Sequence, residues 1–269
     1  MLFRSGRTGP EVVVLHGGPA AAGSAYGIAA GLADAFRVLE PWQRGAGEVP
    51  LTVAVHVADL HHLITTRCDA AAPAIVGQSW GAMLALAYAA VHPDRAGPLV
   101  LVGCGTFDPV SRTELNRRLD ERLTDDLRRQ LADLDRQPMP DHQRMLAAHQ
   151  IRQPIYEYDP LPEPPHPAES HKPPFDMEAH NQTWRDMLAL QVGGLYPNAF
   201  RAIRSPVLMV HGEHDPHPGA LIRDSLTPHI PHLFYQELPR CGHSPWRERH
   251  AQDVFFRILR EWLSLDRRS

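Results

Sequence analysis

A serine lies in a sequence context that is typical of nucleophilic catalysis. Ser79 is the centre of Gly77-Gln78-Ser79-Trp80-Gly81, a G-x-S-x-G element. The run Ala74-Ile75-Val76 before it predicts a buried strand, and Ala82–Ala90 after it predicts a helix. A tight strand-to-helix turn of this kind lifts the serine hydroxyl above the end of a sheet, and the flanking glycines let the two backbones approach closely. The pattern therefore predicts that Ser79 is a nucleophile.

A nucleophilic serine needs donors that stabilise the negative charge developing on the attacked carbonyl oxygen. The N-terminus of the helix after Ser79 supplies the backbone N–H of Trp80. His16-Gly17-Gly18-Pro19 follows the strand-like run Val12–Leu15 and supplies the second donor, which we assign to Gly18 because the proline has no N–H. The histidine that opens this loop is interpreted as a structural hydrogen-bonding residue. The alternative for the whole loop is an ordinary turn at the end of a strand.

The acid that supports the base is predicted to follow a later strand. The loop His211-Gly212-Glu213-His214-Asp215-Pro216-His217 comes directly after the strand-like run Pro206–His211. The chain order serine, acid, histidine favours Asp215, and Glu213 is the weaker candidate. The three histidines of the loop could alternatively bind a metal, but a loop interrupted by a glycine and a proline does not guarantee that their side chains converge. We expect no metal here.

The general base is predicted to be His243. It lies in Cys241-Gly242-His243-Ser244-Pro245-Trp246, just after the strand-like run Leu233–Leu238 and 28 residues beyond Asp215. The preceding glycine gives the loop freedom to place an imidazole above the serine turn. An ordinary surface histidine is the alternative. Cys241 is interpreted as a buried loop residue and not as a nucleophile, because Ser79 already occupies the strand-to-helix turn that presents the nucleophile.

Alternating strand-like and helix-like stretches position these loops. Short β-branched runs separated by longer helical stretches are typical of βαβ units and a parallel sheet. The expected strands are Val12–Leu15, Phe36–Leu39, Ala74–Gly77, Leu99–Val102, Pro206–His211 and Leu233–Leu238, and the expected helices are Ala20–Ala35, Thr52–Arg67, Trp80–Val91, Ala220–Thr227 and Glu248–Leu263. The first strand is preceded by eleven residues, enough for one short strand in a hairpin, so we expect a shortened sheet.

The alternation stops between residues 107 and 202, where no comparable strand-like run occurs. Thr113–Asp135 predicts one charged amphipathic helix or two, and Asp141–Gln150 predicts another. Ten prolines between Pro138 and Pro174 predict irregular, mobile loops.

We therefore expect an α/β core made of residues 1–106 and 203–269, with an inserted, mostly helical, proline-rich cap at 107–202. Such an insertion leaves the C-terminal edge of the sheet, where ligands bind in parallel α/β folds. The cap is expected to cover Ser79 and to set specificity.

Composition excludes several classes of protein. The formal net charge is −4 and no basic stripe is present, so nucleic acid is not an expected partner. Three scattered cysteines do not form a disulfide framework, and neither an apolar leader nor an 18-residue apolar run occurs. We expect a cytoplasmic protein whose partner is a small-molecule substrate and not a membrane. These features do not specify an oligomeric state.

Together, the serine turn, the His16–Pro19 loop, the acid loop and the histidine loop resemble those of the α/β-hydrolase superfamily, over nearly the whole chain outside the cap. With the Trp42-Gln43-Arg44-Gly45 segment, they look most like proline iminopeptidases and their relatives. The resemblance implies an α/β-hydrolase fold, a Ser-His-Asp triad, a covalent acyl-enzyme, no cofactor and a helical cap.

The chain departs from that family's pattern at two positions. Ala20 replaces the last glycine of HGGPG, and Trp42 replaces the aspartate of DQRG. The family's amine-reading glutamates lie in its cap, where Glu178, near Trp184, is a loose candidate here.

The expected function is therefore a serine hydrolase acting on a small ester or amide. An aminopeptidase like the proline iminopeptidases is the narrower alternative, and requires cap carboxylates that bind a free amine. A non-catalytic small-molecule binding protein on the same fold is the alternative of a different class. Epoxide hydrolase and dehalogenase chemistry are disfavoured, because those relatives have an aspartate where Ser79 stands.

Overall fold

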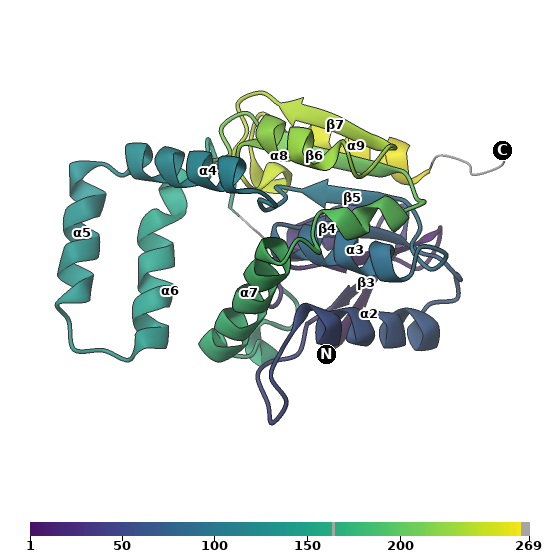
Figure 1. Cartoon of the computed structure of the whole chain (residues 1–269), viewed down its shortest axis with the longest axis horizontal. Helices are drawn as coiled ribbons and strands as arrows, with labels where there is room; N and C mark the ends of the chain where they lie inside the picture. The colour runs from purple at the N-terminus through teal and green to yellow at the C-terminus, as the bar shows by residue number, and fades with distance from the viewer. Residues whose placement is uncertain (163–164, 265–269) are drawn as a thin grey trace.

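A computed structural model describes residues 1–162 and 165–264 and contains, within these ranges, one seven-stranded sheet (Figure 1). The strand order is β1-β3-β2-β4-β5-β6-β7, and every neighbouring pair except β1–β3 is parallel. The strands are β1 (Leu2–Ser5), β2 (Glu11–Leu15), β3 (Arg37–Pro41), β4 (Ala74–Gln78), β5 (Leu99–Val102), β6 (Val207–Gly212) and β7 (Leu233–Leu238). The expected mostly parallel α/β fold is confirmed. Residues 163–164 of the expected cap and 265–269 of the expected core lie outside the described residues.

Helices pack on both faces of the sheet because successive strand residues point to opposite sides. In β2, Val13 and Leu15 belong to one apolar core, and Val12 and Val14 belong to the other. The helices on the side of Val13 are α2 (Val53–Arg67), α3 (Trp80–Val91) and α8 (Gly219–Leu226), and those on the side of Val12 are α1 (Tyr26–Leu32) and α9 (Gln252–Leu263).

The chain between β5 and β6 forms a mostly helical insertion. It contains α4 (Pro109–Arg122), α5 (Asp125–Asp135), α6 (Asp141–Arg152) and α7 (Met177–Val192), with short 3₁₀ turns η1 (Gln153–Ile155), η2 (Glu169–His171) and η3 (Asn198–Ala202). In Figure 1, α5 and α6 lie side by side and extend away from the sheet.

The charged stretch after β5 folds as two helices because each has its own N-cap. Asp108 accepts hydrogen bonds from the backbone of Val110 and Ser111 and begins α4, and Thr124 accepts one from Leu127 and begins α5. Leu123, between them, is extended and ends the first helix.

Two expected features at the N-terminal end are wrong in detail. β1 pairs with β3 and not in a hairpin with β2, because β2 is already hydrogen-bonded on both edges, to β3 and to β4. The helix expected over Ala20–Ala35 is limited to α1, since Ala20 and Gly23 have positive φ angles of 70° and 78° and cannot continue a right-handed helix.

Among the described residues, no helix is both long and apolar enough to cross a bilayer.

The packing of α9 gives a direct test of the second core. Phe255 is fully buried there, whereas its neighbour Val254 is 38% exposed. Phe255→Ala should lower the free energy of unfolding by about 3–5 kcal/mol, because it leaves a large cavity. Val254→Ala, the matched control, should change it by about 0.5 kcal/mol or less. Denaturant titration measures both, and equal effects would contradict this placement of α9.

Candidate active site

Ser79 lies in the tight turn between β4 and α3. Its φ is 54° and its ψ is −114°, a conformation that persists only where the surrounding structure holds it. The two glycines of the motif permit the turn: a Cβ on Gly77 would lie 2.3 Å from the carbonyl oxygen of Gly81, and one on Gly81 would lie 2.3 Å from that of Leu15. The serine is half-buried at the C-terminal end of β4.

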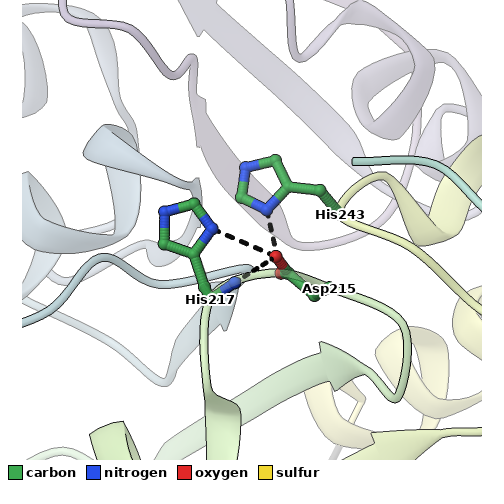
Figure 2. A group of neighbouring side chains, drawn as sticks. All are labelled: Asp215, His217 and His243. Carbon is green, nitrogen blue, oxygen red and sulfur yellow. Dashed lines mark hydrogen bonds and ion pairs between the residues drawn. The ribbon is translucent and has the colours of Figure 1, made fainter. Parts of the chain in front are cut away.

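Asp215 and His243 lie on loops at the same edge of the sheet. Asp215 follows β6 and His243 follows β7, and these strands are parallel neighbours. Oδ2 of Asp215 is 2.8 Å from Nδ1 of His243 (Figure 2). The other ring nitrogen of His243, Nε2, lies 3.3 Å from Nε2 of Gln78, the residue before Ser79. The imidazole therefore spans the distance between the acid and the serine turn.

The carboxylate of Asp215 is completely buried and is surrounded by imidazoles. Its Oδ1 accepts hydrogen bonds from the backbone N–H of His217 at 2.9 Å and from Nδ1 of the same residue at 3.0 Å (Figure 2). Nε2 of His211 accepts from the backbone N–H of Cys104, which puts the proton of that ring on Nδ1, 3.5 Å from Oδ2 of Asp215. With His243, three imidazoles meet one carboxylate.

These contacts determine the protonation states of Asp215, His243 and His217. Burial alone would raise the pKa of Asp215, but His243 and His217 hold it well below its usual range. Burial tends to lower the pKa of His243, and Asp215 and Glu157 outweigh this, so that its pKa is raised. For His217 burial prevails and lowers the pKa. At neutral pH the acid is thus ionised, and His243 is the more basic of the two rings.

The histidine-rich loop divides its side chains between different surroundings. His211 and His217 contact Asp215, whereas the ring of His214 packs edge-on against a tyrosine of the insertion. In the described part of the chain, the group of three or more residues whose metal-ligating atoms all lie within 4.8 Å of one another is Asp215, His217 and His243. Both rings of that group already direct Nδ1 at the carboxylate. That no metal is needed stays a prediction.

A cavity of about 700 Å³ lies at this edge of the sheet. It is lined by Ser79 and His243, and also by Gly18 and Trp80, the two expected oxyanion donors. The insertion contributes a large part of the wall, including Tyr156, Glu157, His166, His180 and Trp184. Ser79, His243 and the insertion therefore border the same space, and Asp215 lies buried behind His243.

Gln43 connects the segments that carry the two expected donors. Its Oε1 accepts a hydrogen bond from the indole N–H of Trp80 at 2.8 Å, and its Nε2 donates to the carbonyl oxygen of His16 at 3.0 Å. Its backbone N–H donates to Nε2 of His16 at 3.0 Å, so this histidine makes structural hydrogen bonds. Gly18 has a φ of 114°, which favours glycine at that position.

Trp42, which departs from the family pattern, packs where the insertion meets the core. Its ring centroid lies 4.6 Å from that of Phe3 and 5.3 Å from that of His166. Nε2 of His166 is 3.3 Å from the buried carboxylate of Glu40 in β3. An aromatic residue at position 42 therefore helps to hold residues near 166 against the core.

Within the described part of the insertion, one carboxylate lines the cavity, that of Glu157. Glu157 is buried, and its Oε1 accepts a hydrogen bond from Oγ of Ser244 at 3.0 Å. Burial raises its pKa to about 7. Glu178, the loose candidate from the sequence, is exposed, is hydrogen-bonded to Gln182 and does not line the cavity.

Three residues of the site had no expected role. Gln43 lies in the Trp42–Gly45 segment. The resemblance of this segment to the family pattern marked it as a motif but did not assign a role to the glutamine side chain. His217 belongs to the histidine-rich loop, and its spacing from Asp215 could have indicated a contact. Glu157 lies in the proline-rich part of the insertion, where the sequence carries no periodicity that would reveal which way it points.

Comparisons with known proteins are consistent in fold. A family model described as alpha/beta hydrolase fold matches residues 10–246. The chain is 35% identical to the proline iminopeptidase of Neisseria gonorrhoeae over 115 residues, which cover 40% of this chain and 37% of that relative. This match thus spans little more than a third of the relative's length.

Solved structures show the same fold at low sequence identity. VinJ has a TM-score of 0.67 at 19% identity, over 97% of this chain and 93% of that chain. The enol-lactonase from Burkholderia xenovorans LB400 has a TM-score of 0.61 at 22% identity, over 98% and 96%. The resemblance expected from the motifs is confirmed by the family match and the seven-stranded sheet of the described residues. The chain belongs to the α/β hydrolase fold family.

Proposed function

We propose that this protein is a serine hydrolase that cleaves a small ester or amide through a covalent acyl-enzyme. The observation that carries the proposal is the 2.8 Å contact between Asp215 and His243, since His243 lines the same cavity as Ser79. A nucleophile, a base and an acid that orients the base are the three parts that acyl transfer requires.

The proposed reaction follows from these parts. Ser79 Oγ attacks the substrate carbonyl carbon while His243 Nε2 takes the hydroxyl proton. Asp215 holds the ring through Nδ1 and stabilises the imidazolium. His243 then gives the proton to the leaving alcohol or amine, and the acyl group stays on Ser79. In the second half, His243 removes a proton from water as the water attacks the acyl-enzyme, and then returns that proton to Ser79 Oγ as the ester bond breaks and the acid leaves.

Two backbone donors, the N–H groups of Gly18 and Trp80, are assigned the role of stabilising the negative charge that develops on the carbonyl oxygen. Gln43 supports this assignment, since it links the side chain of Trp80 to the loop that contains Gly18. Preorganised donors of this kind lower the barrier because they need no reorganisation as the charge forms.

Residues 107–202 are assigned to a cap that sets specificity over a core of residues 1–106 and 203–269. Support comes from the cavity wall, to which the insertion contributes both aromatic and charged side chains. A small-molecule substrate that fits between the cap and Ser79 is the proposed partner, and the proposed chemistry uses no cofactor.

An aminopeptidase is the second candidate, and Glu157 is the observation that favours it. A buried carboxylate in the same cavity as Ser79 and His243 can bind the free amine of an aminoacyl substrate. The partial identity to a proline iminopeptidase supports the same substrate class.

Replacement of the nucleophile tests the main proposal. Ser79→Ala should lower kcat for a short p-nitrophenyl ester by about 10⁴-fold or more, because no acyl-enzyme can form. Ser225→Ala, which removes a hydroxyl bonded within α8, is the matched control and should leave kcat unchanged. A wild-type protein that binds small esters or amides without turnover would instead support a non-catalytic binding protein.

The pH dependence of kcat/KM tests the role of Asp215. Catalysis requires neutral His243, whose pKa is raised, so activity should rise with pH through a midpoint above the ordinary value of 6.5. In Asp215→Asn the larger of the two charges that raise the pKa of His243 is gone, while burial and Glu157 remain, so the midpoint should move to lower pH. The plateau should also fall by about 10⁴-fold. An unchanged midpoint would show that Asp215 does not act on the base.

The variant Glu157→Gln distinguishes between the two proposed substrate classes, simple esters or amides and aminoacyl substrates with a free amine. If Glu157 binds an amine, kcat/KM for proline p-nitroanilide should fall about 10- to 100-fold, the range for losing one charge-assisted hydrogen bond. Hydrolysis of a short ester at about pH 8 should change by about threefold or less, since an ester has no amine to lose. Glu178→Gln is the matched control, with its carboxylate outside the cavity. Equal losses on both substrates would contradict amine binding.

A further inference from the structure

The loop that carries His243 is joined to the insertion by a seam of backbone hydrogen bonds. The seam contains His243 N to Tyr156 O at 2.8 Å, Arg249 N to Asp159 O at 3.1 Å, Leu161 N to Arg247 O at 2.6 Å, and an antiparallel bridge between Pro160 and Glu248. Segments almost ninety residues apart in the chain therefore pair like two short strands.

Glu248 closes this seam from inside. Its side chain is fully buried, and its two oxygens accept three backbone hydrogen bonds. Oε1 accepts from Gly242 at 2.9 Å and from Tyr158 at 2.8 Å, and Oε2 accepts from Asp159 at 2.7 Å. One carboxylate thus binds the residue before His243 and two residues of the insertion. Hydrogen bonds to a charged acceptor are stronger than neutral ones, and leaving such donors unpaired in a buried place is costly.

Gly242 shows how closely the two segments approach. A Cβ at this position would lie 2.3 Å from the carbonyl oxygen of Tyr156 and 2.6 Å from Oε1 of Glu248. The next two residues are also anchored: the N–H of His243 is bonded to Tyr156, and the hydroxyl of Ser244 to Glu157. Three successive residues around the base are therefore fixed by the insertion or by Glu248.

We propose that Glu248 is a positioning residue that holds the loop of His243 against the segment Tyr156–Leu161, and that this seam stays closed while substrate enters. This inference rests on the proposed serine hydrolase function. The mobility expected for the proline-rich stretch therefore does not extend to Tyr156–Leu161.

Glu248→Gln tests the positioning role. A glutamine keeps one acceptor oxygen but presents an N–H₂ group to at least one of the three donors, so the seam loosens. We expect kcat on a short ester to fall about 10- to 100-fold, with KM changed by about threefold or less and the protein folded at the assay temperature. Gly242→Ala should have a similar effect, and the double variant should lose less than the product of the two losses, because both changes open the same seam.

Glu261→Gln, which changes an exposed carboxylate on α9 that is paired with Arg257, is the matched control and should match the wild type. A folded Glu248→Gln protein with kcat within about twofold of the wild type would overturn the proposal. A lower melting temperature with unchanged kcat would give Glu248 a purely structural role and overturn it as well.

A disulfide tests whether the seam must open. Asp159→Cys with Arg249→Cys places two thiols across it, on residues whose backbones are hydrogen-bonded and whose side chains are paired. The oxidised variant should keep the kcat/KM of its reduced form. Activity that is lost on oxidation and restored by a reductant would show that substrate entry opens the seam.

Hydrogen exchange gives a readout that is independent of catalysis. The amides of Tyr158, Asp159 and Gly242 should be protected in the wild type and should lose protection in Glu248→Gln. If the wild type shows this protection but neither hydrolyses esters nor reacts with a fluorophosphonate, the proposed function fails while the seam stands. If these amides exchange freely in an active wild type, the seam proposal fails alone.

Discussion

Burial of the Asp215 carboxylate is the constraint on which the rest of the site depends. An ionised acid with no exposed surface is stable only if its hydrogen-bond acceptors are paired. Here the two oxygens face His243 and His217, and the backbone N–H of His217 adds a third donor. The arrangement fixes the orientation of His243, and it requires that the loops after β6 and β7 keep their relative position.

The sheet fixes the relative position of these loops because β4, β6 and β7 run parallel and end at one edge. Ser79 follows β4, Asp215 follows β6 and His243 follows β7, so residues far apart in sequence lie on loops at the same edge of the sheet. The insertion contributes Glu157 to the wall of the cavity. This second carboxylate has fewer partners than Asp215, and its raised pKa contrasts with the lowered pKa of Asp215. Glu157 lines the cavity, whereas Asp215 is buried behind His243, so the two acids lie in different surroundings.

The core was predictable from the sequence because its signals are local. The β-branched run before Ser79 and the glycines around it require a strand, a turn and a helix, whatever the rest of the chain does. The contact between Asp215 and His243 follows from the same reasoning, since strand-end loops of a parallel sheet converge. Pairing of β1 was not predictable, because it depends on which strand edge is left free after β2 has bonded both neighbours. Glu157 and the Glu248 seam were missed because tertiary contacts, and not a repeating pattern, determine where the insertion touches the core.

The central claim is that a single serine forms a covalent intermediate with the substrate. Its most direct test is reaction with a fluorophosphonate, followed by mass spectrometry of the intact protein and of its peptides. The account predicts one adduct per chain, on the peptide that contains Ser79, and no adduct at the cysteines, which are buried or half-buried. An unmodified Ser79, or an adduct on another residue in an active protein, would contradict it.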